Sequence, residues 1–110
     1  MSVVRAGDLI HRVTVQETVR SDDGAGGHTL SFVGRATVSA RVMGTGGREV
    51  MEAKKLNPKI THVVRMRWRS DVDATQRLLF DGRALNIVAA YDPDGMRTEL
   101  LVQCEEDASP

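Results

Sequence analysis

The side chains that could do chemistry in this chain are few and widely separated. The three histidines, His11, His28 and His62, lie in different segments, without the spacing of metal ligands. The only cysteine, Cys104, falls at an inward position of a predicted strand, and the glycines of residues 44–47 lack the following lysine of a phosphate-binding loop. No nucleophile has a partner base in a known motif. We therefore expect no enzyme activity, no metal site and no cofactor.

An acidic pair, Asp22 and Asp23, opens a glycine-rich segment. A calcium loop of the EF-hand type needs further acidic ligands at fixed intervals and a terminal glutamate, which this segment lacks. Residues 20–28 are polar and contain three glycines, which predicts a flexible, exposed hairpin loop. We interpret the two aspartates as exposed charges that are available to a protein partner.

The strongest polar feature is a row of arginines in residues 61–69. Successive side chains of a strand point to opposite faces, so this alternating segment predicts one basic and one apolar face. The basic face carries Arg65, Arg67 and Arg69, and the other carries His62, Val64, Met66 and the only tryptophan, Trp68. The arginines could pair with acids of a neighbouring strand, contact an acidic protein partner or bind nucleic acid.

Composition favours the protein partner over the nucleic acid. Fifteen Lys+Arg residues balance fifteen Asp+Glu residues, whereas a dedicated nucleic-acid binder normally has a basic surplus. Aromatic residues make up only 4% of the chain, and Trp68, Phe32 and Phe80 are assigned to the core, which leaves little for stacking on bases. No apolar segment approaches the roughly 20 residues of a membrane span, and no signal peptide is evident, so we expect a protein made in the cytosol.

The elements that position these residues are mostly alternating segments. Residues 9–19 and 28–43 are predicted strands, and the second exceeds the usual strand length, so we expect a bulge or bend near Gly34. His11 lies on the apolar side of the first strand, which predicts a histidine at the edge of the core, hydrogen-bonded to the backbone. Residues 105–110 form an acidic tail that we expect to be frayed.

Two turns predict the registers of the C-terminal hairpins. A two-residue turn at residues 81–82 places Leu78 opposite Leu85. A four-residue turn at residues 92–95 places Tyr91 opposite Met96. Both registers direct one set of side chains to the core: Leu78, Phe80, Leu85, Ile87, Ala89, Tyr91, Met96, Leu100, Val102 and Cys104.

Residues 48–56 are good helix formers between a glycine-rich segment and Pro58. The apolar stripe is limited to Val50, Ala53 and Leu56, and so short a helix is marginal in isolation. We expect residues 44–58 to become ordered only by docking. Together, the elements predict a single domain over residues 1–110 that is mainly β: a small antiparallel β-barrel of about six strands, with one short helix inserted between strands 2 and 3.

Several short motifs follow one another over nearly the whole chain. They are Ala6-Gly7-Asp8-Leu9 followed by His11-Arg12-Val13, a polar Asp-Gly loop, Val38-x-Ala40, Gly47-Arg48-Glu49, Thr61-His62-x-Val64-Arg65-x-Arg67 and Asp81-Gly82-Arg83-x-Leu85-x-Ile87. In this order and at this chain length, they resemble the phage head–tail joining family. This family comprises the head-closure, stopper or head completion proteins of tailed phages and gene transfer agents.

The resemblance implies a β-barrel subunit of a homo-oligomeric ring, six- or twelve-fold, in the neck of a virion assembled in the bacterial cytoplasm. Such a ring lies between the portal or adaptor ring and the tail-terminator or tail proteins. Double-stranded DNA passes through its channel, and the ring helps to retain packaged DNA and provides the tail attachment point. The resemblance implies no catalytic site and no membrane partner.

Within such a ring, we expect residues 44–58 to lie toward the channel, where ring neighbours or the channel would order the helix. The cations nearest DNA would be Arg48, Lys54 and Lys55. The loop of residues 20–28 is the second candidate for the channel, or for gripping an adjacent ring. Contacts between subunits or with partners would use Arg65, Arg67, Arg69, Asp22 and Asp23.

Two other functions remain open. A free nucleic-acid-binding β-barrel predicts that the monomer binds oligonucleotides in a salt-dependent manner. A ring protein of the tail-terminator type is separated from the preferred function only by the family motifs. A small hydrolase would need His11 or His62 beside acidic side chains, and the spacing does not provide this.

Overall fold

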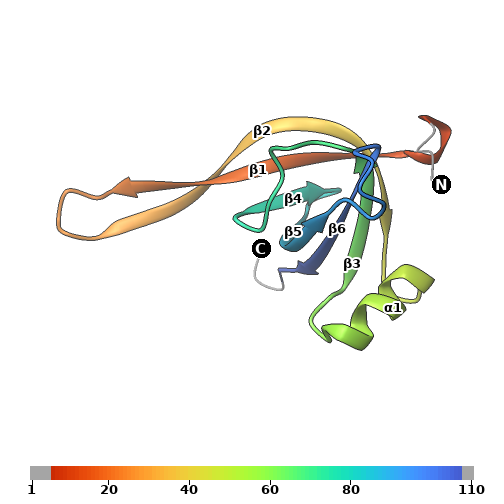
Figure 1. Ribbon diagram of the computed structural model, residues 1–110. Helices are drawn as coiled ribbons and strands as arrows, with labels where there is room; N and C mark the ends of the chain where they lie inside the picture. The colour runs from red at the N-terminus through yellow and green to blue at the C-terminus, as the bar shows by residue number, and fades with distance from the viewer. Residues whose placement is uncertain (1–5, 108–110) are drawn as a thin grey trace.

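Six antiparallel strands close into a barrel from which a long hairpin projects (Figure 1). The computed structural model describes residues 6–107. A short 3-10 helix, η1 (Ala6–Asp8), precedes β1 (His11–Asp22), β2 (His28–Met43), α1 (Arg48–Leu56), β3 (His62–Arg67), β4 (Gln76–Phe80), β5 (Arg83–Tyr91) and β6 (Glu99–Glu106). The strand order around the barrel is β1-β2-β3-β6-β5-β4. The predicted fold class and the position of the helix are confirmed.

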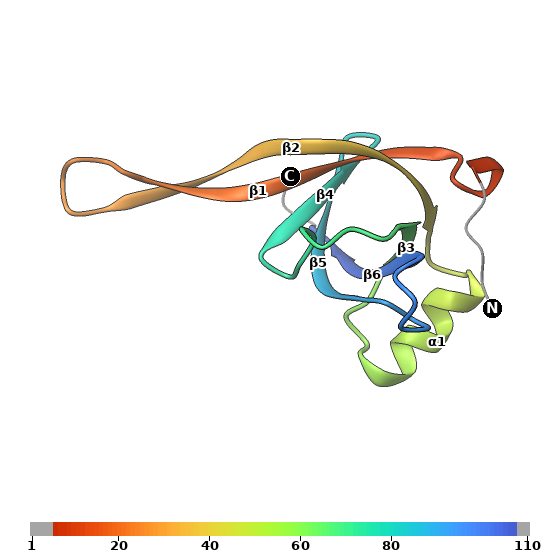
Figure 2. The ribbon, with the colours of Figure 1, turned by 45° about the horizontal axis from the view of Figure 1, so that its top comes forward.

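The hairpin leaves the barrel next to a β-bulge. Between β1 and β2 the register shifts, so that Val15 opposes Ala36 while Gln16 opposes Gly34, and Arg35 is the extra residue. The bulge predicted near Gly34 is therefore confirmed. Pairing of β1 with β4 ends at Glu17, and residues 18–32 continue as a two-stranded hairpin, which we call the arm. The arm makes the molecule 53 Å long, against 26 and 25 Å in the other directions (Figure 2).

The predicted loop of residues 20–28 is shorter than expected, because four of its nine residues belong to strands. β1 runs to Asp22 and β2 begins at His28, so that only residues 23–27 form the turn. In the turn, Gly24 and Gly26 adopt φ angles of 79° and 84°, a left-handed conformation that favours glycine. The alternating pattern of β1 faded at residue 20, because the side chains of β1 from Thr18 onward are exposed on both faces.

The main core fills the barrel with side chains from all six strands. Its buried members are Val13, Val15, Ala40, Val64, Met66, Val72, Leu78, Leu85, Ile87, Leu100, Val102 and Cys104, with Trp68 and Phe80 packed against them. Phe32 was expected in this core and is instead 37% exposed on the arm. Its ring lies under the guanidinium of Arg77, 3.5 Å from the ring centroid. The prediction was wrong because β2 has already left the barrel at this residue.

The two C-terminal hairpins differ in how well their turns predicted them. Leu78 opposes Leu85, as expected from the two-residue turn. Tyr91, however, opposes Leu101 instead of Met96, because the loop extends over residues 92–98. The Asp92 carboxylate accepts hydrogen bonds from the backbone N–H of Gly95 (3.1 Å) and of Arg97 (2.7 Å), which stabilises the longer loop.

A second bulge in β5 restores the core beyond this longer loop. The register shifts between Ile87 and Ala89, so Val88 is the extra residue and Ala90 instead of Ala89 packs against the core. Tyr91 and Met96, both predicted to be inside, are 44% and 56% exposed. Apart from Ala89, the other members of the predicted core set lie in the core or pack against it, including Leu100, Val102 and Cys104.

Helix α1 docks on the outer surface of its own barrel. Val50 and Ala53 form a second buried cluster with Ile60 and Val63, flanked by Met43, Val88 and Leu101. Leu56 was predicted in the apolar stripe but is 91% exposed. The expectation that ring neighbours or the channel order this helix is therefore replaced, because outward-facing apolar residues of β3 and β6 already pack against it.

The chain ends are partly described. Residues 105 and 106 belong to β6, and the N–H of Asp107 donates a hydrogen bond to the carbonyl of Ala84 (2.8 Å), so this part of the predicted frayed tail is paired. Residues 1–5 and residues 108–110 of the tail lie outside the described residues.

Candidate interaction surfaces

The arginine row does not form one continuous basic face. Arg65 Nε lies 3.5 Å from Oε2 of Glu99 on the neighbouring strand β6, an ion pair without hydrogen-bond geometry. Glu99 is only 2% exposed, so this pair contributes to the fold. Arg69 forms a two-point contact with Asp71, at 2.9 and 2.8 Å, and this hydrogen bonding lowers the pKa of Asp71. Arg67 is exposed and remains available to a partner.

A basic depression lies where β2 and β3 diverge. The two strands pair over only four residues of β2, Ala40 to Met43, and a cavity of about 350 Å³ follows the point of divergence. Its lining includes Arg12, Arg67, Arg69 and Trp68. Arg69 is already paired with Asp71, so Arg12 and Arg67 are the cations of this cavity that suit carboxylate or phosphate groups. Arg12 was missed as a site residue because it comes from another strand, and only the fold brings it to this cavity.

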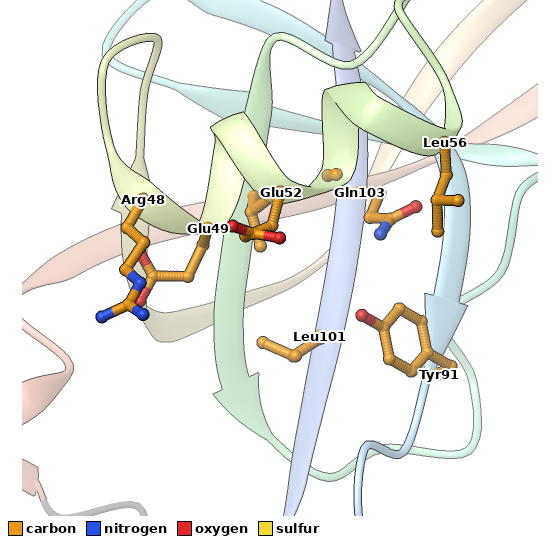
Figure 3. A pocket seen from close by; sticks show the side chains of 9 residues that line it. Arg48, Glu49, Glu52, Leu56, Tyr91, Leu101 and Gln103 are labelled. Carbon is orange, nitrogen blue, oxygen red and sulfur yellow. The ribbon is translucent and has the colours of Figure 1, made fainter.

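An apolar groove of about 550 Å³ lies between α1 and the barrel (Figure 3). Ala53, Val63 and Leu101 line it, and Leu56 and Tyr91 stand at its exposed side. The charged side chains of the helix that line the groove are Arg48, Glu49 and Glu52.

The predicted DNA-facing cations are not gathered at one site. Arg48 lines this groove, whereas Lys54 is half-buried and Lys55 lies 3.3 Å from Glu52 in an exposed ion pair. The same short helix also carries Glu49, so its net charge is only one positive unit, from three cations and two glutamates. The helix therefore presents mixed charges.

Contacts with the barrel brace the base of the arm. Arg77 Nε donates a hydrogen bond to Gln16 Oε1 (2.7 Å), and its guanidinium stacks on Phe32. The Thr18 hydroxyl donates to the carbonyl of Thr75 (3.1 Å), and Arg35 pairs with Glu17 at 2.7 Å. These contacts fix the direction in which the arm leaves the barrel.

The predicted partner residues Asp22 and Asp23 build the turn at the tip of the arm. Asp22 Oδ1 accepts a hydrogen bond from the N–H of Gly24 (3.1 Å), and Asp23 Oδ1 accepts from the N–H groups of Ala25 (2.8 Å) and Gly27 (3.1 Å). Both residues are exposed. Their charges thus lie at the tip of the arm, which projects away from the barrel (Figure 1).

The histidines and the cysteine have structural environments. His11 Nδ1 accepts a hydrogen bond from the N–H of Val42 (3.0 Å), which confirms the predicted backbone contact. Cys104 is fully buried, and burial raises the pKa of its thiol to about 12. In the described part of the chain, no three His, Cys, Asp or Glu side chains gather as a metal site. Within residues 6–107, no helix is long and apolar enough to cross a membrane.

Comparison with known proteins agrees with this architecture. Residues 4–107 match the family described as phage head completion protein. The head completion protein gp7 of Enterobacteria phage HK97 is 30% identical over 107 residues, which are 93% of this chain and 96% of gp7. The solution structure of protein SF1141 from Shigella flexneri 2a is 26% identical, with a TM-score of 0.75 over 97% of this chain and 100% of that one.

A chain in the virion of a native gene transfer agent particle shares the fold at 21% identity. Its TM-score is 0.61, and the match covers 97% of each chain. The family match extends from the N-terminal motif to β6, so it includes the barrel, the arm and α1. The chain therefore belongs to the family of phage head completion proteins, which are structural virion proteins and not enzymes.

Proposed function

We propose that this protein is a connector subunit of the stopper or head-closure type. Copies of it form a ring between the portal or adaptor of a DNA-filled head and the tail. The ring helps to retain packaged DNA and provides the attachment point for the tail. The observation that supports this most is the shape of the chain: a closed barrel with the arm and helix α1 at opposite ends (Figure 1).

This arrangement suits a head-to-tail ring. A surface on one side of a subunit can contact a different surface on its neighbour, and such contacts close into a ring when the rotation allows it. The basic depression with Arg12 and Arg67 would take acidic groups of a neighbouring subunit, and the acidic tip of the arm, with Asp22 and Asp23, would grip an adjacent ring. Six-fold and twelve-fold rings both fit this proposal.

The candidate DNA-facing segment remains residues 44–58, with Arg48, Lys54 and Lys55. Deleting residues 45–57 is not a clean test, because Val50 and Ala53 cover Ile60 and Val63 in the second core cluster. Point substitutions avoid this problem. Arg48 and Lys55 are exposed, so replacing them changes charge without opening the core.

The test compares two double variants in virion particles. Arg48→Gln/Lys55→Gln should give tailed particles that lose DNA, since the channel loses two positive charges per subunit. Arg41→Gln/Arg83→Gln is the matched control, because it removes two exposed positive charges that lie outside α1, on β2 and β5. The measurement is the nuclease-protected DNA per particle. Full DNA retention by the first variant contradicts the channel assignment.

Ring assembly has its own test. Arg67→Glu places a negative charge in the basic depression, so it should weaken ring formation while leaving the melting temperature of the monomer unchanged. Native mass spectrometry of the rings measures the first effect. Normal rings from Arg67→Glu would return this arginine to a solvated strand face. Salt-dependent binding of oligonucleotides by the monomer would favour the alternative nucleic-acid-binding module.

A further inference from the structure

We propose that neighbouring copies pair through the backbone of their arms: the free edge of β2 in one copy adds to the free edge of β1 in the next. The arms of a ring then form one continuous antiparallel sheet. This inference rests on the proposed ring and specifies how its subunits join. It assigns to the arm a partner, which is a second copy of the same chain.

Both strands of the arm have long free edges. β3 covers β2 only from Ala40 to Met43, which leaves residues 28–39 of β2 unpaired on that side. β4 covers β1 only from Thr14 to Glu17, which leaves residues 18–22 unpaired. The strands of the barrel close into a ring, in which residues 87–91 of β5 extend beyond the pairing with β4. A free strand edge is a row of N–H and C=O groups that can pair with another chain.

The register identifies the backbone groups that point outward. In an antiparallel pair, opposed residues alternate between those that bond each other and those whose N–H and C=O point away. The N–H of Asp23 donates to the carbonyl of Gly27 (3.1 Å), which fixes the phase of this alternation at the tip. Two steps along, Ser21 and Thr29 bond each other, and so do Val19 and Ser31.

The residues between these bonded pairs direct their backbone groups away from the hairpin. On β2 they include Leu30 and Phe32, and on β1 they include Arg20 and Asp22. A neighbouring strand would bond to these groups. The inference therefore names individual amides, which an experiment can examine one at a time.

The edges of the arm lack the usual protection against strand addition. Natural proteins shield edge strands with lysine, proline or bulges. Residues 18–32 contain no lysine and no proline, and the bulge at Arg35 lies outside them, toward the barrel. A two-stranded hairpin is marginally stable alone in water, so added strands would stabilise the arm.

The faces of the arm favour recognition through the backbone over insertion into a groove. One face carries Leu30 and Phe32 beside Arg20 and Thr18, which oppose them. The other face carries Val19 among serine and threonine side chains. Neither face is a continuous apolar surface. The backbone edges are the more regular feature of the arm.

A second copy fits both edges at once. β1 and β2 are antiparallel. A neighbour related by a rotation that keeps the arms pointing in one direction therefore places its β1 antiparallel to β2 of the first copy. A single foreign strand would cover one edge and leave the other free. Repeating the same contact around a ring leaves no free edge in the arms.

Hydrogen exchange tests the pairing amide by amide. The monomer is compared with the ring isolated from disrupted particles. The amides of Arg20, Leu30 and Phe32 should exchange rapidly in the monomer and slowly in the ring, while those of Val19 and Ser31 keep more similar rates. A ring in which the outward amides gain no protection overturns this inference and leaves the proposed function intact. Particles that contain no ring of this protein overturn both.

Two substitutions at one residue separate backbone from side chain. Leu30→Pro removes an outward N–H, whereas Leu30→Thr keeps it and shortens the side chain. Ring formation should fall about tenfold or more for Leu30→Pro and change about twofold or less for Leu30→Thr, because only the first loses a hydrogen bond at each contact. Equal losses from both variants, or normal rings from Leu30→Pro, contradict the inference. Monomer melting curves confirm that each barrel is folded.

Discussion

The same two strands build the most enclosed and the most exposed regions of this protein. In the barrel, Val13 and Val15 of β1 and Ala40 of β2 are almost completely buried. In the arm, every residue from Thr18 to Phe32 is exposed. The bulge at Arg35 lies between the two regions, since β2 pairs with β3 only from Ala40 onward and β1 pairs with β4 only up to Glu17. The β1–β2 hairpin thus contributes to the core at its barrel end and is available for assembly at its arm end.

This division separates stability from interaction along a single element. Burial of apolar side chains stabilises the barrel and α1, whereas the arm buries almost nothing until it meets a partner. Substitutions in the barrel should therefore change the free energy of unfolding, and substitutions in the arm should change assembly. Four predictions test this comparison.

The largest effect compares one substitution in the two regions. Leu85→Ala removes a fully buried side chain and should lower the free energy of unfolding by about 2–5 kcal/mol. Leu30→Ala, at a residue that is 62% exposed, should change it by less than about 0.5 kcal/mol. Denaturant unfolding of the monomers measures both. Similar losses would mean that the arm contributes to the folded core.

The second prediction concerns helix α1, which belongs to the stable region. Val50→Ala should lower the free energy of unfolding by about 2 kcal/mol, because the Val50 side chain is fully buried between α1 and the barrel. Leu56→Ala on the same helix is the control and should cost almost nothing, since Leu56 is 91% exposed. The same unfolding measurement applies. If Val50→Ala were neutral, docking of α1 would not contribute to the stability of the isolated chain.

The third prediction is a pH dependence that arises in the barrel and not in the arm. Burial lowers the pKa of His62 below 6.5, partly opposed by Glu106 at 3.8 Å. At a pH between the pKa of His62 in the folded chain and its pKa in the unfolded chain, His62 is protonated to a greater extent in the unfolded chain. The free energy of unfolding therefore falls as the pH drops below about 6.5.

His62→Asn should remove this component, which we expect to be about 1 kcal/mol or less between pH 7.5 and 5.5. The measurement is the free energy of unfolding at each pH. His28→Asn, in the arm, should keep the pH profile of the natural protein. An unchanged profile in His62→Asn would assign the acid sensitivity to other groups.

The smallest expected effect is an unchanged rate. Because Cys104 is buried with a pKa of about 12, thiol reagents at pH 8 should label it only when the barrel unfolds. Leu30→Ala should leave the labelling rate unchanged, whereas Leu85→Ala should raise it roughly thirtyfold or more. Faster labelling in the arm variant would show that the arm and the barrel unfold together.

Several features of the fold could be predicted because their signals are local. The turn at residues 81–82 fixed the pairing of Leu78 with Leu85, and the length of β2 indicated a bulge near Gly34. The loop of residues 92–98 was underestimated because the Asp92 side chain bonds backbone groups up to five residues later. The bulge at Val88 then compensated, which no alternating pattern shows in advance.

The candidate surfaces were less predictable than the fold. Alternation in residues 61–69 correctly separated Val64 and Met66 from the arginines, but it did not show that Arg65 faces Glu99 on β6. Nor did it show that Arg67 and Arg69 share a depression with Arg12 from β1. These surfaces combine residues that are far apart in sequence.

The sequence by itself determined the types of element, their order and most of the core. The reason is that the strands of the barrel alternate apolar and polar residues, and this alternation shows which side chains face inward. Only the tertiary structure decided where the hairpin leaves the barrel, where α1 docks and which arginines already have partners. These features depend on which strands lie side by side and on where water reaches them. Residues 20–28 illustrate the difference: their polar composition correctly indicated exposure, but the extension of β1 to Asp22 emerged only from its pairing with β2.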